Sequence, residues 1–218
     1  MSVAIGTAIV SYIEPEAGYA SAFNEWYERD HFPATVLAGP GVFSGARFVA
    51  DAACRARRPA DGTLFGDPDR GRFLALAWVL PDRQAEWDAW VAAEMDALVA
   101  AGRMFPHREH LHTAVYRFVR AAGPIPAPMA LAHGFAGVVA TATVAEPPEG
   151  SLAPCTVVLA SERTILSSAD PPAHHLVLAF TDGDPAGAAV PPVTAGGYAS
   201  PFRATVPGTD THIEGDRP

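Results

Sequence analysis

The stretch FNEWYERDHFP, residues 23–33, decides the fold class that the sequence predicts. Phe23, Tyr27 and His31 recur at every fourth position, so they lie on one face of an amphipathic helix. Trp26 widens this face, whereas most residues between these positions are polar or charged and can face water. The face should pack on the core, which is an unusual place for a histidine unless its imidazole serves a pocket or is paired.

The segments around this helix predict a regular order of elements. Strands are expected at residues 3–12, 42–52, 73–80 and 112–119, and helices at about residues 16–31 and 82–101. The order βαββαβ is that of a ferredoxin-like unit. An antiparallel sheet with both helices on one face leaves the other face uncovered, so a second domain or a second subunit must cover it.

The second half of the chain has a different character. After a ferredoxin-like domain at residues 1–122, residues 123–129 read as a stiff proline-rich linker. Residues 130–206 are β-rich and poor in helix, with strands expected at 135–145, 155–161, 175–180 and 198–206. One interpretation is a degenerate second repeat that has lost its helices, although the FNEWY motif does not recur. The tail at residues 207–218 is expected to be mobile.

Composition limits the partners and the compartment. The chain has 218 residues, a net charge of -9 and 49% hydrophobic residues, which allows a substantial core. An acidic chain is a poor candidate for binding nucleic acid or an anionic membrane. No apolar run reaches the roughly 18 residues that a membrane span needs, and no signal peptide is apparent at the N-terminus. We therefore expect a cytoplasmic protein whose Cys54 and Cys155 are free thiols.

Several chemistries are excluded by missing residues and motifs. The chain contains no lysine, so it can form no Schiff base and holds no P-loop lysine. It has neither the GxGxxG pattern of dinucleotide-binding proteins nor the GxSxG elbow of hydrolases. We therefore expect no cofactor.

Three motifs lie within residues 22–49: FNxWYxxxHxP, GPGVF at residues 39–43 and ARF at residues 46–48. Through them residues 3–120 resemble the dimeric α/β-barrel superfamily, most closely its EthD-like, stress-responsive-type members. This resemblance implies two sheets packed into a barrel, from two subunits or tandem repeats. The fold class expected is thus α+β: a ferredoxin-like βαββαβ unit in a dimeric α/β-barrel-type body with a helix-poor, β-rich second half, as a homodimer.

His31 is the leading candidate for chemistry. Its imidazole is suited to general acid/base work near neutral pH, and Tyr27, one turn earlier, would orient the substrate or the imidazole. Alternatively, His31 caps the C-terminal end of the helix. Arg47 would bind a carboxylate or phenolate in a cleft between the first helix and the sheet, or form a salt bridge at the rim of that cleft.

A second group of histidines lies at residues 107–112. Alternation along a strand places His110 and His112 on one face, close enough to His31 to contact a substrate. A zinc or iron site there is less favoured, because the spacing matches no common ligand motif. The substrate-binding residues predicted from the sequence are Phe23, Trp26, Arg47, Trp90, His110 and His112.

Together these observations and the resemblance favour a cofactor-independent enzyme. It would act by general acid/base proton transfer on a small apolar carbonyl or aromatic, polyketide-like compound, as a cyclase, isomerase or dehydratase. One alternative is a non-catalytic small-molecule-binding or stress-response module. The other is a haem- or metal-binding barrel protein.

Overall fold

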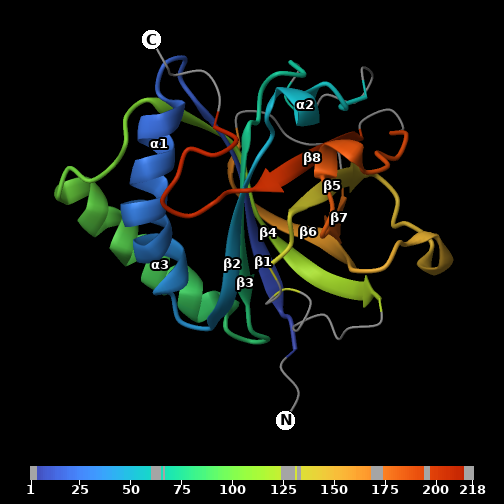
Figure 1. Cartoon of the computed structure of the whole chain (residues 1–218). Coiled ribbons are helices and arrows are strands. Elements are labelled where there is room, and N and C mark those ends of the chain that lie inside the picture. Colours follow the sequence, from blue (N-terminus) through green and yellow to red (C-terminus); the bar gives the residue numbers. More distant parts are fainter. Residues whose placement is uncertain are drawn as a thin grey trace.

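The computed structural model describes residues 4–59, 65, 67–123, 131, 134–167, 174–193 and 197–213. Within them, the strands form one closed antiparallel barrel in the order β1-β3-β2-β8-β5-β7-β6-β4 (Figure 1). The strands are β1 (Thr7–Pro15), β2 (Val42–Val49), β3 (Phe73–Val79), β4 (Arg108–Ala122), β5 (Gly137–Thr143), β6 (Thr156–Ser167), β7 (His175–Thr181) and β8 (Tyr198–Ala204). The predicted linker falls almost wholly outside the described residues.

The closed barrel corrects the predicted fold class. A ferredoxin-like α+β unit in a dimeric α/β-barrel body is wrong, because the two halves of one chain close a single antiparallel barrel. Strand β4 pairs with β6 along most of its length, and β2 pairs with β8 at its end. The inner face of β1–β4 is therefore covered by β5–β8 without a second subunit. The homodimer stays a prediction.

Two clusters of buried side chains hold the barrel and its helices together. Inside the barrel, Leu76, Trp78 and Phe202 are almost completely buried. On the outer face of β1, β3 and β4, residues such as Phe73 pack against Phe23 and other residues of the helices. In Figure 1 the two long helices stand together on one side of the barrel. The second half contributes only single-turn helices to the described residues.

The first helix begins and ends later than predicted. Helix α1 (Ala20–Trp26) continues as two π-helical segments, η1 (Tyr27–His31) and η2 (Pro33–Leu37). The predicted end at residue 31 is therefore wrong. Pro33 is the first residue of η2 and, because proline has no N–H, it donates no hydrogen bond to the preceding turn. The other helices are α2 (Ala52–Arg55), α3 (Gln84–Ala100) and the short turns η3 (Glu149–Ser151) and η4 (Pro185–Gly187).

None of the helices in the described residues is both long enough and apolar enough to cross a bilayer.

Candidate functional site

A cleft of about 410 Å³ opens in the wall of the barrel beside β2. It exists because β2 and β8 pair at only two positions, Phe48 with Ala204 and Val49 with Arg203. The preceding residues of β2, from Ser44 to Arg47, line the cleft instead of pairing with β8. The halves of the chain meet at β4–β6 and at β2–β8, and the second of these junctions leaves an opening between its strands.

The wall of this cleft is mainly apolar. Phe48, Trp78 and Phe180 also belong to the core inside the barrel, so the cleft leads from the surface toward the interior. Phe180 lies with its ring centroid 6.4 Å from that of Phe48 and 5.0 Å from that of Phe135. Small-molecule pockets typically have volumes of about 300–1,000 Å³ and mostly apolar walls. The remaining large apolar side chains of the wall are Phe32, Leu37 and Leu131.

Arg47 is the buried cation of the cleft. Its Nη2 donates a hydrogen bond of 2.9 Å to Asn24 Oδ1, and its guanidinium carbon lies 4.9 Å from the centre of the Tyr27 ring. Its Nη1 is buried and has no hydrogen-bond partner among the described residues, while Glu28 Oε2 lies 3.8 Å away. Burial lowers the pKa of Arg47, and Tyr27 and Glu28 oppose this shift. The two N–H groups on Nη1 thus make no hydrogen bond within the described residues.

The C-terminal segment holds these polar groups in place. Thr205 N donates a hydrogen bond of 3.0 Å to the carbonyl of Arg47, and Gly208 N donates one to Glu28 Oε1. The amide nitrogen of Asn24 donates to Thr209 O at 3.1 Å. In Figure 1 this segment, drawn in red, runs beside α1. The described part of the predicted mobile tail therefore packs on the helix and fixes the side chains around Arg47.

His31 lies on the outer side of the sheet and does not line the cleft. Its side chain is buried, stacked on Trp26 at 4.5 Å and set edge-on to Tyr27 at 5.2 Å between ring centroids. Its Nδ1 is buried and has no partner among the described residues. Burial, assisted by Arg108 and His110, lowers the pKa of His31 to about 3. The imidazole is therefore neutral at physiological pH.

His110 lies in the same cluster as His31. Its Nε2 accepts a hydrogen bond of 3.2 Å from Arg108 Nε, and its Nδ1 is 3.3 Å from Thr113 Oγ1. Burial and the Arg108 charge lower the pKa of His110 to about 4. The Arg108 guanidinium also lies 4.7 Å from the centre of the Trp26 ring. The structure thus brings the predicted residues Trp26, His31 and His110 together, but in a packed cluster.

His112 lies elsewhere, inside the barrel, with Nε2 3.1 Å from the hydroxyl of Tyr116. The prediction that His110 and His112 share a face is wrong. The pairing of β1 with β4 shifts between Tyr12 and Ile13, so alternation is interrupted at Leu111, which also belongs to the interior core. Within the described ranges, no group of three or more His, Cys, Asp or Glu side chains is placed to hold a metal ion.

The other two predicted substrate-binding residues pack between the helices and the sheet. Phe23 is fully buried, with its ring centroid 4.9 Å from that of Phe73. Trp90 packs against the same outer cluster. Of all the residues predicted for the site, only Arg47 lines the cleft. Sequence reasoning missed Glu28, Phe48 and Phe180, whose positions depend on how the two halves of the chain meet.

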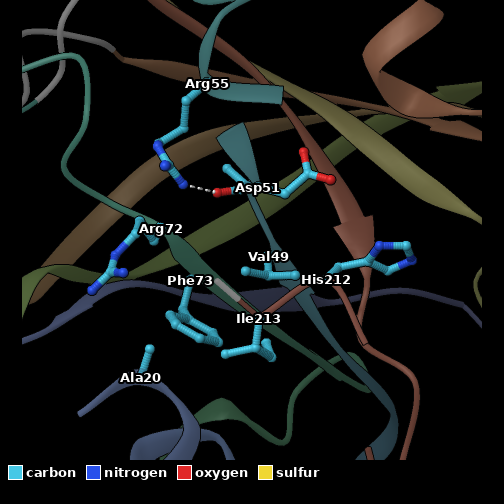
Figure 2. A pocket seen from close by; sticks show the side chains of 9 residues that line it. Ala20, Val49, Asp51, Arg55, Arg72, Phe73, His212 and Ile213 are labelled. Carbon is cyan, nitrogen blue, oxygen red and sulfur yellow. Dashed lines mark hydrogen bonds between the residues drawn. The ribbon is translucent and has the colours of Figure 1, made fainter. Parts of the chain in front are cut away.

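A second, much smaller pocket lies beside the end of β2, where Figure 2 shows Arg55 and Arg72 at its edge. Its volume is about 10 Å³, and a single water already needs roughly 10–15 Å³. In Figure 2 the side chain of Ile213 lies next to Phe73. The C-terminal segment thus closes this pocket to anything larger than water.

Comparison of the chain with models of known protein families finds no match, and comparison with curated proteins finds none either. The resemblance to the dimeric α/β-barrel superfamily stays a prediction.

Proposed function

We propose that the protein binds a small, largely apolar organic molecule in the cleft between β2 and β8. The observation that carries this proposal is the cleft itself: about 410 Å³ with aromatic walls that continue into the barrel. Burying the apolar surface of a ligand there would supply the binding free energy. The few polar groups would fix its orientation.

The acid/base enzyme centred on His31 remains the alternative proposal, and the geometry favours it less. His31 and Tyr27 lie outside the cleft, and burial raises the pKa of Tyr27 to about 12. A base whose conjugate acid has a pKa of about 3 is weak at neutral pH. The ionisable side chains that line the cleft are Glu28 and Arg47. Binding without catalysis by His31 is therefore the function that fits best.

Filling the cleft is expected to abolish binding of an apolar probe. Ala46 lines the cleft from β2, so Ala46→Phe would place a ring in the space that the ligand needs. The fluorescence of N-phenyl-naphthylamine, a neutral apolar dye, measures the dissociation constant directly. We expect saturable binding to the original protein and a loss of about tenfold or more in the variant, which corresponds to about 1.4 kcal/mol.

The matched control is Ala93→Phe, which adds the same ring to an exposed position of α3. This variant should bind the dye like the original protein. Equal affinity of the original protein and Ala46→Phe would show that the dye binds elsewhere, and absence of saturable binding to the original protein would refute the proposed function.

A further inference from the structure

Nη1 of Arg47, which makes no hydrogen bond among the described residues, points to a specific chemical group on the ligand. Arg47 is only 8% exposed, and it lines the cleft with its Nη1 buried and unbonded among the described residues. A buried donor without an acceptor is costly, whereas hydrogen bonds from charged donors are stronger than neutral ones. A ligand that presents an oxygen to Nη1 therefore gains more than one that is purely hydrocarbon.

The position of Glu28 decides which kind of oxygen fits. Its Oε2 lies 3.8 Å from Arg47 Nη1, which is too far for a hydrogen bond. At this distance the negative charge of Glu28 still offsets most of the positive charge of the Arg47 guanidinium. A carboxylate or phenolate bound at Nη1 would lie next to the Glu28 carboxylate and be repelled by it. A neutral carbonyl oxygen would accept the hydrogen bond without that repulsion.

We propose that the ligand is a neutral carbonyl compound, with an aromatic or aliphatic body in the apolar cleft and its carbonyl oxygen on Arg47 Nη1. This inference rests on the proposed function of the cleft. Arg47 is already oriented for it by Asn24, whose own amide is held by Thr209 O. Arg47 would thus determine which apolar molecules are selected, and Glu28 would exclude the anionic ones.

Three compounds of nearly equal size test this proposal by displacement of bound N-phenyl-naphthylamine: methyl naphthyl ketone, naphthoate and ethylnaphthalene. In the original protein we expect the ketone to bind about tenfold more tightly than the hydrocarbon, since a hydrogen bond to a charged donor is worth about 1.5 kcal/mol or more. Naphthoate should bind more weakly than the ketone. In Arg47→Met the advantage of the ketone over the hydrocarbon should disappear.

A second variant keeps the test decisive if Arg47→Met does not fold. Glu28→Gln removes the negative charge but keeps an oxygen that can accept from Gly208 N. We expect naphthoate to gain about tenfold in affinity in this variant while the ketone changes less than about threefold. Glu25→Gln makes the same change at an exposed position of α1 that does not line the cleft, and it should change neither affinity.

The outcomes separate the two proposals. If the dye binds in the cleft but the ketone and the hydrocarbon bind equally, the carbonyl inference fails and the proposed function stands. Tightest binding of naphthoate to the original protein, or no gain of naphthoate in Glu28→Gln, also overturns the inference. If neither the dye nor any of the three compounds binds, the proposed function itself fails.

Discussion

Replacing Arg58 with methionine is expected to lower the free energy of unfolding by about 3–5 kcal/mol. The Arg58 side chain is buried and donates hydrogen bonds to Ser200 Oγ at 2.9 Å and to the carbonyl of Gly71 at 3.0 Å. It also donates to the carbonyls of Pro68 and Arg70. Methionine would fill part of the space but leave these acceptors without their donor, so the segment before β3 would lose its connection to β8.

Urea-induced unfolding followed by circular dichroism measures this loss. Arg57→Met is the matched control, because Arg57 is the exposed neighbour of Arg58 and surface substitutions usually change stability by less than about 0.5 kcal/mol. If the two variants were equally stable, the hydrogen bonds of Arg58 would contribute nothing to the fold.

Acidification from pH 7 to pH 4 is expected to destabilise the protein through His31 and His110. An unfolded histidine takes up its proton near pH 6.5, whereas folded His31 and His110 resist protonation down to about pH 3 and pH 4. The unfolded state therefore binds more protons throughout this window, so stability is full above pH 6.5 and falls as the pH falls. For His31 alone the loss by pH 4 is on the order of 3 kcal/mol, at about 1.4 kcal/mol for each unit of pKa.

The variant His31→Gln has no imidazole to protonate at this position and should lose roughly half as much stability over the same pH range, because His110 still contributes. Urea midpoints at pH 7, 5.5 and 4 compare its slope with that of the original protein. Arg108 and His110 lower the pKa of His31, and Asp30 raises it. The variant therefore keeps these three residues, so that only the imidazole of His31 is removed. His107→Gln, at a partly exposed histidine paired with Glu16, serves as control. An unchanged slope in His31→Gln would show that burial of His31 does not govern acid sensitivity.

Local patterns predicted the elements well and their assembly poorly. Phe23, Tyr27 and His31 do share a buried face, and the apolar run at residues 73–80 is the fully buried strand β3. The same four strands, however, can form an open sheet or part of a closed barrel. The choice depends on the pairing of β4 with β6 and of β2 with β8, contacts between distant segments that no local periodicity encodes.

The candidate site shows the same limit. Helical spacing puts Asn24 and Glu28 on the polar side of the first helix, where they should face water. Asn24 is instead buried and bonded to Arg47 and Thr209, because the C-terminal segment covers that side of the helix. Arg47 could be identified as a ligand-binding candidate from its strand position. The Glu28 carboxylate beside Arg47, however, is held by the backbone N–H of Gly208, more than a hundred positions further along the chain.

A crystal structure of the protein with methyl naphthyl ketone bound tests the proposed site most directly. The ring should lie in the cleft between β2 and β8 against Phe48 and Phe180, with its carbonyl oxygen within hydrogen-bond distance of Arg47 Nη1. Density for the ketone beside His31, at Tyr12 and His112 inside the barrel, or only on the outer surface would contradict the assignment of the cleft as the binding site.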